Sequence, residues 1–288
     1  MSPEVTAVIT TRGRPDRVHH ALASLRAETH ANVEVIVVDD GAFDATAAGL
    51  HFAFRLLRGS HLGVGRARNL GLDAARGEYV IFLDDDDVAL PHRISSLVQA
   101  ARDRQADLCF GMTRRVVDDT AEVLSDVPTQ LLSSGAIGFC DLLTCAPHIN
   151  AVLVRTETLR AVGGFDSGAE HFDDWSAWLR VADRSSIMWC IAETVAVWHL
   201  HPHGLSALVL QAQAMKLRLV SLFERLQPSL STENARAVAA AGRIVASTNI
   251  HTYDDYANAM AAARDALHAT GSCFGHCLYS RDPATASA

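Results

Sequence analysis

The sequence has no apolar run of the roughly 20 residues needed to cross a bilayer, and no basic N-terminal region followed by an apolar core and a cleavage site. It passes almost directly into a β-branched, apolar segment at residues 5–9. It also lacks basic character, because its net charge is −8, which argues against a general nucleic-acid-binding surface. These absences predict a cytoplasmic enzyme without a transmembrane segment that binds small molecules and no nucleic acid.

The chain has six cysteines, and only two of them lie close together in the sequence. Four cysteines fall singly in apolar contexts, as buried free thiols do in a reducing compartment; they are Cys109, Cys140, Cys145 and Cys190. Cys273 and Cys277 form a cluster, but their spacing departs from that of paired zinc ligands and no second cluster exists. We therefore expect neither a disulfide framework nor a zinc site.

With 288 residues, of which 49% are hydrophobic and 20% charged, the chain is long enough for one large α/β domain with an appendage. Strand patterns at 5–10, 33–38, 53–57 and 79–83 alternate with helical patterns through short connections. This alternation predicts a doubly wound, mostly parallel sheet. After Gly204 the apolar spacing becomes helical. The predicted organisation is an α/β domain at 1–205, a helical appendage at 206–280 and a frayed tail at 281–288.

Four consecutive carboxylates, Asp84 to Asp87, end the fourth predicted strand. In an extended chain, side chains two residues apart share a face, so Asp84 and Asp86 point to one side and Asp85 and Asp87 to the other. This much negative charge is costly unless a cation or several N–H donors offset it. Carboxylate oxygens favour Mg2+ or Mn2+. The alternative interpretation is a solvated acidic turn ahead of the next helix.

Three other segments place polar groups at the end of a predicted strand or the start of a predicted helix. Ligands of parallel sheets bind beyond the carboxyl ends of the strands, so these segments are candidates for the same site. A carboxylate in a helix's first turn also stabilises that end as a cap, which explains one acidic residue more readily than two. The segments are Asp39-Asp40 after the second strand, Asp173-Asp174 at a helix start, and the histidines His199, His201 and His203 after the last strand.

In this order the motifs resemble those of the family 2 glycosyltransferases, which have the GT-A fold. No single motif is specific, but six of them in order favour this family over other folds. The resemblance implies transfer of a sugar from a nucleotide diphosphate donor to a hydroxyl group, with inversion. The motifs, which together cover about residues 5–205, are VVDDG at 37–41, GRARNLG at 65–71, FLDDDD at 82–87, GGFD at 163–166, DDW at 173–175 and a late histidine.

On the donor side, the resemblance implies that Asp39 holds the nucleobase or ribose. The first loop reads Thr-Thr-Arg-Gly-Arg-Pro instead of the more common Thr-Tyr-Asn-Arg-Pro, which removes a tyrosine that can stack near the base. The nucleobase is therefore less defined, and a UDP-sugar is the favoured donor. The other residues implied around the nucleotide are Thr10, Arg12, Arg68, Asp84 and Asp85.

The same resemblance implies a divalent metal, Mn2+ or Mg2+. Asp84 to Asp86 match the family's Asp-x-Asp segment, whose last carboxylate binds the metal directly. That residue is Asp86. His201 matches the family's late histidine, a further metal or diphosphate contact, and His199 and His203 compete for this role.

For catalysis, the resemblance implies that Asp174 is the general base that deprotonates the acceptor hydroxyl. Similar proteins usually carry Glu-Asp where this chain has Asp173-Asp174, so the implied base is retained while the preceding side chain is one methylene shorter. Asp173 is expected to contact the acceptor. Its altered length is consistent with an unusual acceptor or with no effect.

Two other functions use some of the same residues. A nucleotidyltransferase that makes a sugar nucleotide also needs a metal and carboxylates, but its Gly-rich basic phosphate loop is missing, since Arg12-Gly13-Arg14 is a weak substitute. A catalytically silent sugar-nucleotide-binding module would use Asp174 only as a helix cap. We expect a small-molecule or natural-product acceptor that is soluble. Leu217, Val220, Leu222 and Phe223 of the appendage are interpreted as core or homodimer contacts.

Overall fold

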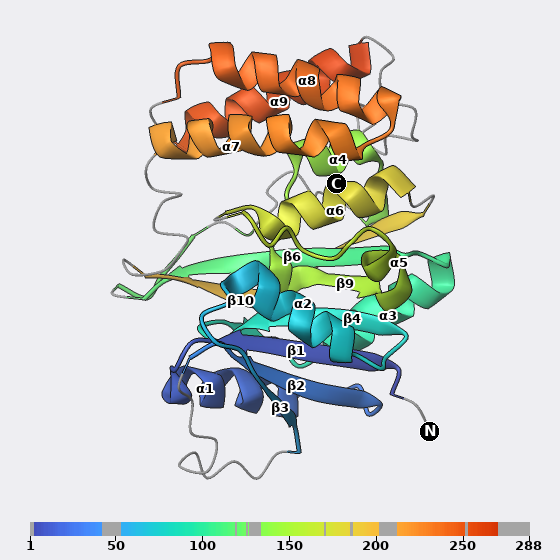
Figure 1. Ribbon diagram of the computed structural model, residues 1–288, viewed down its shortest axis with the longest axis vertical. Coiled ribbons are helices and arrows are strands. Elements are labelled where there is room, and N and C mark those ends of the chain that lie inside the picture. Colours follow the sequence, from blue (N-terminus) through green and yellow to red (C-terminus); the bar gives the residue numbers. More distant parts are fainter. Residues whose placement is uncertain are drawn as a thin grey trace, which may run out of the picture.

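The computed structural model describes residues 3–41, 53–118, 120–124, 126, 134–169, 171–184, 187–201, 212–250 and 253–269. These residues form a ten-stranded mixed sheet with helices on both faces (Figure 1). The strands are β1 (Val5–Thr11), β2 (Val33–Asp39), β3 (Arg55–Arg58), β4 (Tyr79–Asp84), β5 (Val88–Ala89), β6 (Leu108–Val117), β7 (Glu122–Val123), β8 (Gly135–Ala136), β9 (Val152–Arg155) and β10 (Met188–Leu200).

The order along the sheet is β3-β2-β1-β4-β9-β6-β10-β5, with β7 beside β6 and β8 beside β10. Strands β3, β2, β1 and β4 are parallel, as the alternating sequence pattern predicts. Strand β9 runs antiparallel to both β4 and β6, while β6 and β10 are again parallel. The sheet is therefore more mixed than the pattern predicts, because β9 joins the sheet in the opposite direction.

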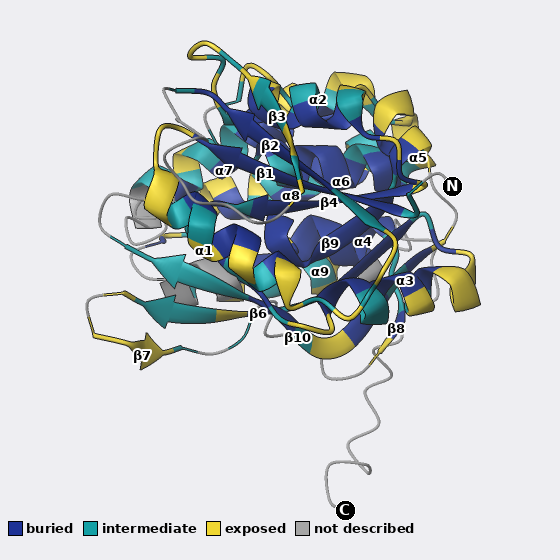
Figure 2. Cartoon of the chain, turned by 90° about the horizontal axis from the view of Figure 1, so that it is seen from below, coloured by how far each residue is buried: buried dark blue, intermediate teal, exposed yellow. Residues whose placement is uncertain are grey.

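Strand β1 is buried along its whole length, so its near-continuous apolar sequence follows from its central position. Figure 2 shows the central strands as buried and β7 as exposed. On one face lies α1 (Pro15–Arg26), whose buried residues Val18, Ala21, Leu22 and Leu25 follow helical spacing. The remaining helices of the α/β part are α2 (Val64–Ala74), α3 (Arg93–Arg104), α4 (Phe139–Thr144), α5 (Thr156–Ala161) and α6 (Asp173–Arg184).

Three further helices, α7 (Ala212–Leu226), α8 (Thr232–Ser247) and α9 (Tyr253–Ala269), form a layer beyond α4 and α6 (Figure 1). Their buried side chains, such as Leu219 and Val238, belong to the same continuous core cluster as Val8 and Phe82 of the sheet. The layer is therefore packed onto the α/β part through a shared core. A boundary at residue 205 and a separate appendage stay predictions, and the tail at 281–288 lies outside the described residues.

The cysteine predictions are partly confirmed. Cys109, Cys145 and Cys190 are buried free thiols. Cys140, in contrast, is disulfide-bonded, because the fold and not the local sequence decides which two cysteines come within bonding distance. Cys273 and Cys277 lie outside the described residues. Among the helices that the structure describes, none combines the length and apolar character needed to cross a membrane.

Candidate active site

A cavity of about 860 Å3 opens at the carboxyl ends of β1, β2 and β4. The register of the strands explains its position, because Thr10 pairs with Asp84 and Thr11 with Asp39, so their loops leave the sheet at one level. Its walls combine acidic, basic and imidazole side chains. The lining includes Thr10, Thr11, Arg12, Arg14, Asp40, Arg68, Asp84, Asp85, Asp86, Asp87, His171, Trp198, His199, His201 and Arg218.

Arg68 joins two of the predicted motifs. It is 5% exposed; its Nη2 lies 2.8 Å from Asp84 Oδ1 and its Nη1 lies 2.8 and 3.0 Å from the two oxygens of Asp173. Burial alone would lower the pKa of Arg68, but the charges of Asp173 and Asp84 raise it above its ordinary value. Arg68 thus ties the end of β4 to the start of α6. Its predicted contact with the base or ribose stays a prediction.

The motif glycines and Asn69 bring α2 to this position. A Cβ on Gly65 would lie 2.7 Å from the carbonyl oxygen of Asp166, so only glycine permits this close approach. Asn69 donates from Nδ2 to the Phe165 carbonyl at 2.9 Å and accepts from the Phe165 N–H at 2.8 Å. The GRARNLG and GGFD segments therefore pack against each other, and this packing holds Arg68 between β4 and α6.

Asp85 is 1% exposed and holds the first loop against β4. Its Oδ2 accepts from Thr11 Oγ1 at 2.5 Å and from Arg14 Nε at 3.0 Å. Burial raises the pKa of Asp85 to about 6, against the opposing effects of Thr11 and Arg14. The carboxylate is thus engaged within the protein, and its predicted nucleotide contact stays a prediction.

Asp86 and His201 lie together in the cavity wall, with His201 Nε2 3.0 Å from Asp86 Oδ2. Arg14 and Arg17 approach the same oxygen at 3.2 and 3.5 Å. Burial alone would raise the pKa of Asp86, but the hydrogen bond from His201 and the charge of Arg14 lower it. His199 is occupied differently, because its Nδ1 donates to the backbone carbonyl of Asp86 at 2.9 Å. His203 lies outside the described residues.

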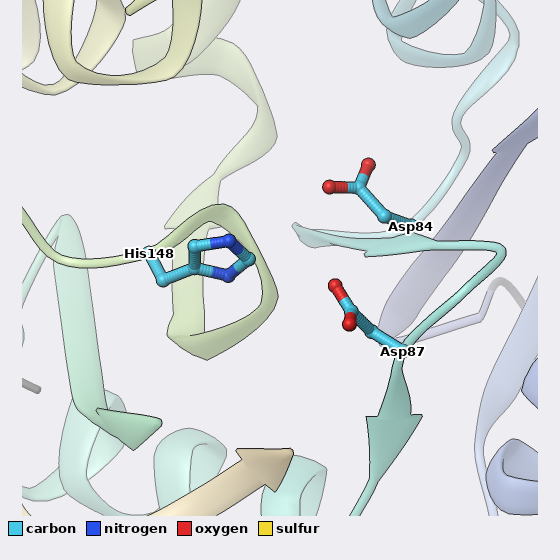
Figure 3. A group of neighbouring side chains, drawn as sticks. All are labelled: Asp84, Asp87 and His148. Carbon is cyan, nitrogen blue, oxygen red and sulfur yellow. The ribbon is translucent and has the colours of Figure 1, made fainter. Parts of the chain in front are cut away.

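A second group of possible cation ligands consists of Asp84, Asp87 and His148, whose ligand atoms lie within 4.8 Å of one another (Figure 3). Asp87 is 2% exposed and accepts from the His199 N–H at 2.7 Å and from the Asn150 side chain. Burial raises the pKa of Asp87 and lowers that of His148 to about 4, so His148 is held in the neutral form that can bind a metal. His148 has no sequence signal of its own, because no motif links it to the distant acidic run.

The residues present fit a hard divalent cation. Carboxylate oxygens and a neutral imidazole suit Mn2+ or Mg2+. Of the two candidate groups, Asp86 and His201 both line the cavity, whereas His148 is not among its lining residues. Asp86 and His201 are thus the better placed pair for a cation shared with a ligand in the cavity.

The two carboxylates at the start of α6 have different surroundings. Asp173 is 4% exposed and paired with Arg68, which leaves it poorly placed to contact an acceptor directly. Asp174 accepts the Trp175 N–H at 2.8 Å. Burial, followed by the charge of Asp173, raises the pKa of Asp174 to about 7. Neither carboxylate is among the residues that line the cavity. The predicted roles of Asp173 and Asp174 stay predictions.

The residue before this pair, Phe172, has a φ of 60°, a conformation that non-glycine residues rarely adopt. Its ring packs edge-on against Trp175 with centroids 5.7 Å apart, and the Trp175 Nε1 donates to the Leu142 carbonyl at 2.7 Å. These contacts fix the first turn of α6, and with it the direction of Asp173 and Asp174.

Asp39 and Asp40 also have different surroundings. Asp39 is fully buried and accepts the Gly41 N–H at 2.9 Å. Asp40 lines the cavity and accepts the N–H groups of Leu62 and Gly63 at 2.6 and 2.8 Å. Asp39 is not among the residues that line the cavity, and its predicted contact with the nucleobase or ribose stays a prediction. Position in the sequence does not distinguish the two carboxylates, because they are adjacent at the end of one strand, and only the resemblance singles out Asp39.

The protein has a GT-A fold. Its mixed sheet places an antiparallel β9 beside β4, and a charged cavity lies beyond the ends of β1, β2 and β4. Two solved structures share this fold. Residues 1–349 of TarS from S. aureus align with a TM-score of 0.60 and 13% identity, covering 91% of this chain and 92% of that one. The mannosyltransferase PcManGT from Pyrobaculum calidifontis, in complex with GDP-Man and Mn2+, aligns with a TM-score of 0.60 and 19% identity, covering 94% and 80%.

Residues 6–131 match the model of Glycosyl transferase family 2. The putative glycosyltransferase EpsH of Bacillus subtilis (strain 168) is 30% identical over 133 residues, which cover 44% of this chain and 38% of EpsH. The succinoglycan biosynthesis protein ExoO of Rhizobium meliloti (strain 1021) is 36% identical over 104 residues, covering 34% and 30%. The chain thus matches less than half the length of these two relatives.

Proposed function

We propose that this protein transfers a glycosyl group from a nucleotide diphosphate-sugar to an acceptor hydroxyl, with inversion at the anomeric carbon. The observation that carries the proposal is one shared cavity, which is lined both by Thr10 and Asp40 and by the acidic residues Asp84 and Asp86. The family match of residues 6–131 supports the same reaction class. TarS and PcManGT have been solved in complex with UDP-GlcNAc and GDP-Man, respectively, and we favour a UDP-sugar here.

In this proposal the diphosphate lies over Asp86 and His201, where a divalent cation, Mn2+ or Mg2+, would be held. When bound, the cation supplies charge that offsets the negative charge developing on the departing diphosphate. Arg14 and Arg17 already lie beside Asp86, so the protein itself contributes positive charge at the same place. The base and ribose extend towards Thr10, Arg12 and Asp40, which line the cavity on the side of β1 and β2.

Asp174 is the proposed general base. It must accept a proton from the acceptor hydroxyl, and a pKa of about 7 is suited to that task near neutral pH. The first cause of this raised pKa is burial, and the second is the negative charge of Asp173. Arg68, which contacts both Asp173 and Asp84, couples the electrostatics of the base to those of the donor site.

A catalytically silent nucleotide-binding module is the competing function, since Asp174 also accepts the Trp175 N–H and so acts locally in the helix start. Two measurements separate the functions. Calorimetry with UDP and GDP, each with Mn2+ and with chelator, tests donor-site binding. Release of UDP from UDP-GlcNAc, or of GDP from GDP-Man, then tests turnover in the parent and in Asp174→Asn.

We expect nucleotide binding that depends on the cation, and turnover that Asp174→Asn removes while nucleotide affinity is kept. Nucleotide binding without any turnover, in parent and variant alike, would favour the silent module. Absence of nucleotide binding under all these conditions would refute the proposed function itself. The acceptor is proposed to be a soluble small molecule or natural product, and a homodimer through the helical layer is a further proposal that sedimentation analysis can test.

A further inference from the structure

The helical layer contributes one side chain to the cavity, Arg218 of α7. Its helix is held in place by Leu219 and Leu222, which are 0% and 1% exposed. Arg225 of the same helix lies 3.7 Å from the Asp166 carboxylate. The spacing of seven residues between Arg218 and Arg225 is close to two helical turns, so both point to the same side of α7.

The loop opposite this side of α7 is itself fixed. The Asp166 carboxylate accepts the Gly168 N–H at 2.9 Å. The Asp166 backbone carbonyl packs so closely against Gly65 that a Cβ there would lie 2.7 Å from its oxygen. Arg225 of α7 thus lies against this loop, while the buried Leu219 and Leu222 anchor the helix in the core. Arg218 lines the same cavity as Ser167 and Gly168 of this loop.

Arg218 differs from the other arginines in the cavity lining. Arg14 is paired with Asp85 and Asp86, Arg68 with Asp84 and Asp173, and Arg12 contacts His61. Within the described part of the chain, Arg218 makes no hydrogen bond or ion pair although it is partly buried. A guanidinium in this setting has its donors available for a ligand, and it matches carboxylate or phosphate oxygens best.

The position of Arg218 argues for an acceptor and against the donor as its ligand. The proposed nucleotide residues, Thr10 and Asp40, belong to β1 and the end of β2, whereas Arg218 comes from a helix beyond α6. The start of α6 also carries Asp174, the proposed base for the acceptor hydroxyl. We infer that Arg218 selects acceptors that carry an anionic group, a phosphate or a carboxylate, near the hydroxyl that is glycosylated.

This inference rests on the proposed function, so the first step of its test measures UDP binding to the parent with Mg2+. Absence of UDP binding would refute the proposed function, independently of Arg218. The protein saturated with UDP and Mg2+ is then titrated with inorganic phosphate and, separately, with glucuronate and uncharged glucose, followed by ligand-observed NMR. Saturation with UDP keeps the added anion out of the diphosphate position.

We expect Arg218→Gln to weaken binding of phosphate or glucuronate at least tenfold, because a charge-assisted hydrogen bond is lost, and Arg218→Lys to retain part of it. Arg236→Gln is the matched control, since Arg236 is an exposed arginine of α8 that does not line the cavity. It should change nothing. UDP affinity should stay within twofold in all three variants. A preference for phosphate over glucuronate, or the reverse, identifies the anionic group.

Three results would overturn the inference. The first is an anion affinity of the UDP-saturated parent that is no greater than its affinity for glucose. The second is anion binding that survives in Arg218→Gln. The third is a tenfold loss of UDP affinity in Arg218→Gln, which would assign Arg218 to the donor's diphosphate.

Discussion

The ends of β1, β2 and β4 and the layer formed by α7, α8 and α9 are stabilised by different interactions. At the strand ends, charged side chains form ion pairs, as Arg68 does with Asp84 and Asp173. In the helical layer the buried residues are apolar, for example Leu222, Val238 and Ala263. Hydrogen bonds and ion pairs require a particular geometry, whereas apolar burial is non-directional. Substitutions at the strand ends should therefore alter binding and turnover, and those in the helical layer mainly stability.

The same contrast appears in the family match, which covers residues 6–131 and none of α7 to α9. The matched segment includes Asp40, Arg68 of α2 and the acidic run from Asp84 to Asp87. In the proposed function these residues form the donor site, and donor binding constrains them chemically. The helical layer needs only to keep its apolar faces, apart from positions such as Arg218 that reach the cavity.

The largest effect is expected for Arg68→Met, which should lower the free energy of unfolding by about 3–5 kcal/mol, because it leaves the buried Asp173 carboxylate without its partner. Chemical denaturation measures this loss. The double variant with Asp173→Asn should recover part of it, since the uncompensated charge is gone. An unchanged stability of Arg68→Met would show that this ion pair does not organise the site.

Leu222→Ala tests the helical layer. Leu222 is 1% exposed, and its truncation should cost about 2–5 kcal/mol of stability while UDP affinity stays within twofold. Denaturation and calorimetry on the same preparation give both numbers. A tenfold loss of UDP affinity in the folded variant would contradict the division between the two regions.

Asp174→Asn should reduce transfer about 100-fold, equivalent to about 2.7 kcal/mol in the barrier, with UDP affinity kept. Since Asp174 must be ionised to act, kcat/KM of the parent should rise with pH through about 7 and level off above it. This rising limb should vanish from the residual activity of the variant. Turnover within a few-fold of the parent would eliminate Asp174 as the base.

The raised pKa of Asp174 also has a stability consequence. Between its ordinary value of 3.8 and about 7, the folded protein binds more protons at Asp174 than the unfolded chain does. The contribution of Asp174 to stability is therefore most favourable at low pH and declines as pH rises through this range. Asp174→Asn should remove this decline, which denaturation at pH 5 and pH 8 can measure.

The smallest effect is expected for Asp86→Ala, which should weaken UDP binding about tenfold, or 1.4 kcal/mol, in the presence of Mn2+. Its carboxylate lies 3.0 Å from His201 in the cavity wall. Without metal, the variant and the parent should bind UDP similarly. Asp16→Ala, an exposed carboxylate of α1, is the control for the lost charge. If Asp86→Ala kept the full metal dependence of UDP binding, the cation site would be assigned to Asp84, Asp87 and His148 instead.

Much of the fold could be predicted because each element carries a local signal. The apolar strand at 33–38 and the helical spacing of Val18, Leu22 and Leu25 require no knowledge of distant residues. The antiparallel β9 had no such signal, because strand direction is set by the path of the chain and not by side-chain pattern. The same limit applies to Cys140, whose bonding partner is selected by the fold.

For the site, the sequence by itself determined that carboxylates gather at the ends of β2 and β4 and at the start of α6, because strand ends in such sheets face one edge. Only the tertiary structure decided how each carboxylate is used. Asp39 is buried while Asp40 lines the cavity, and His148 joins Asp84 and Asp87 from a distant loop. These differences depend on burial and on partners that are distant in the sequence, such as Asn150 for Asp87, His201 for Asp86 and Asp173 for Arg68. A local pattern cannot encode them.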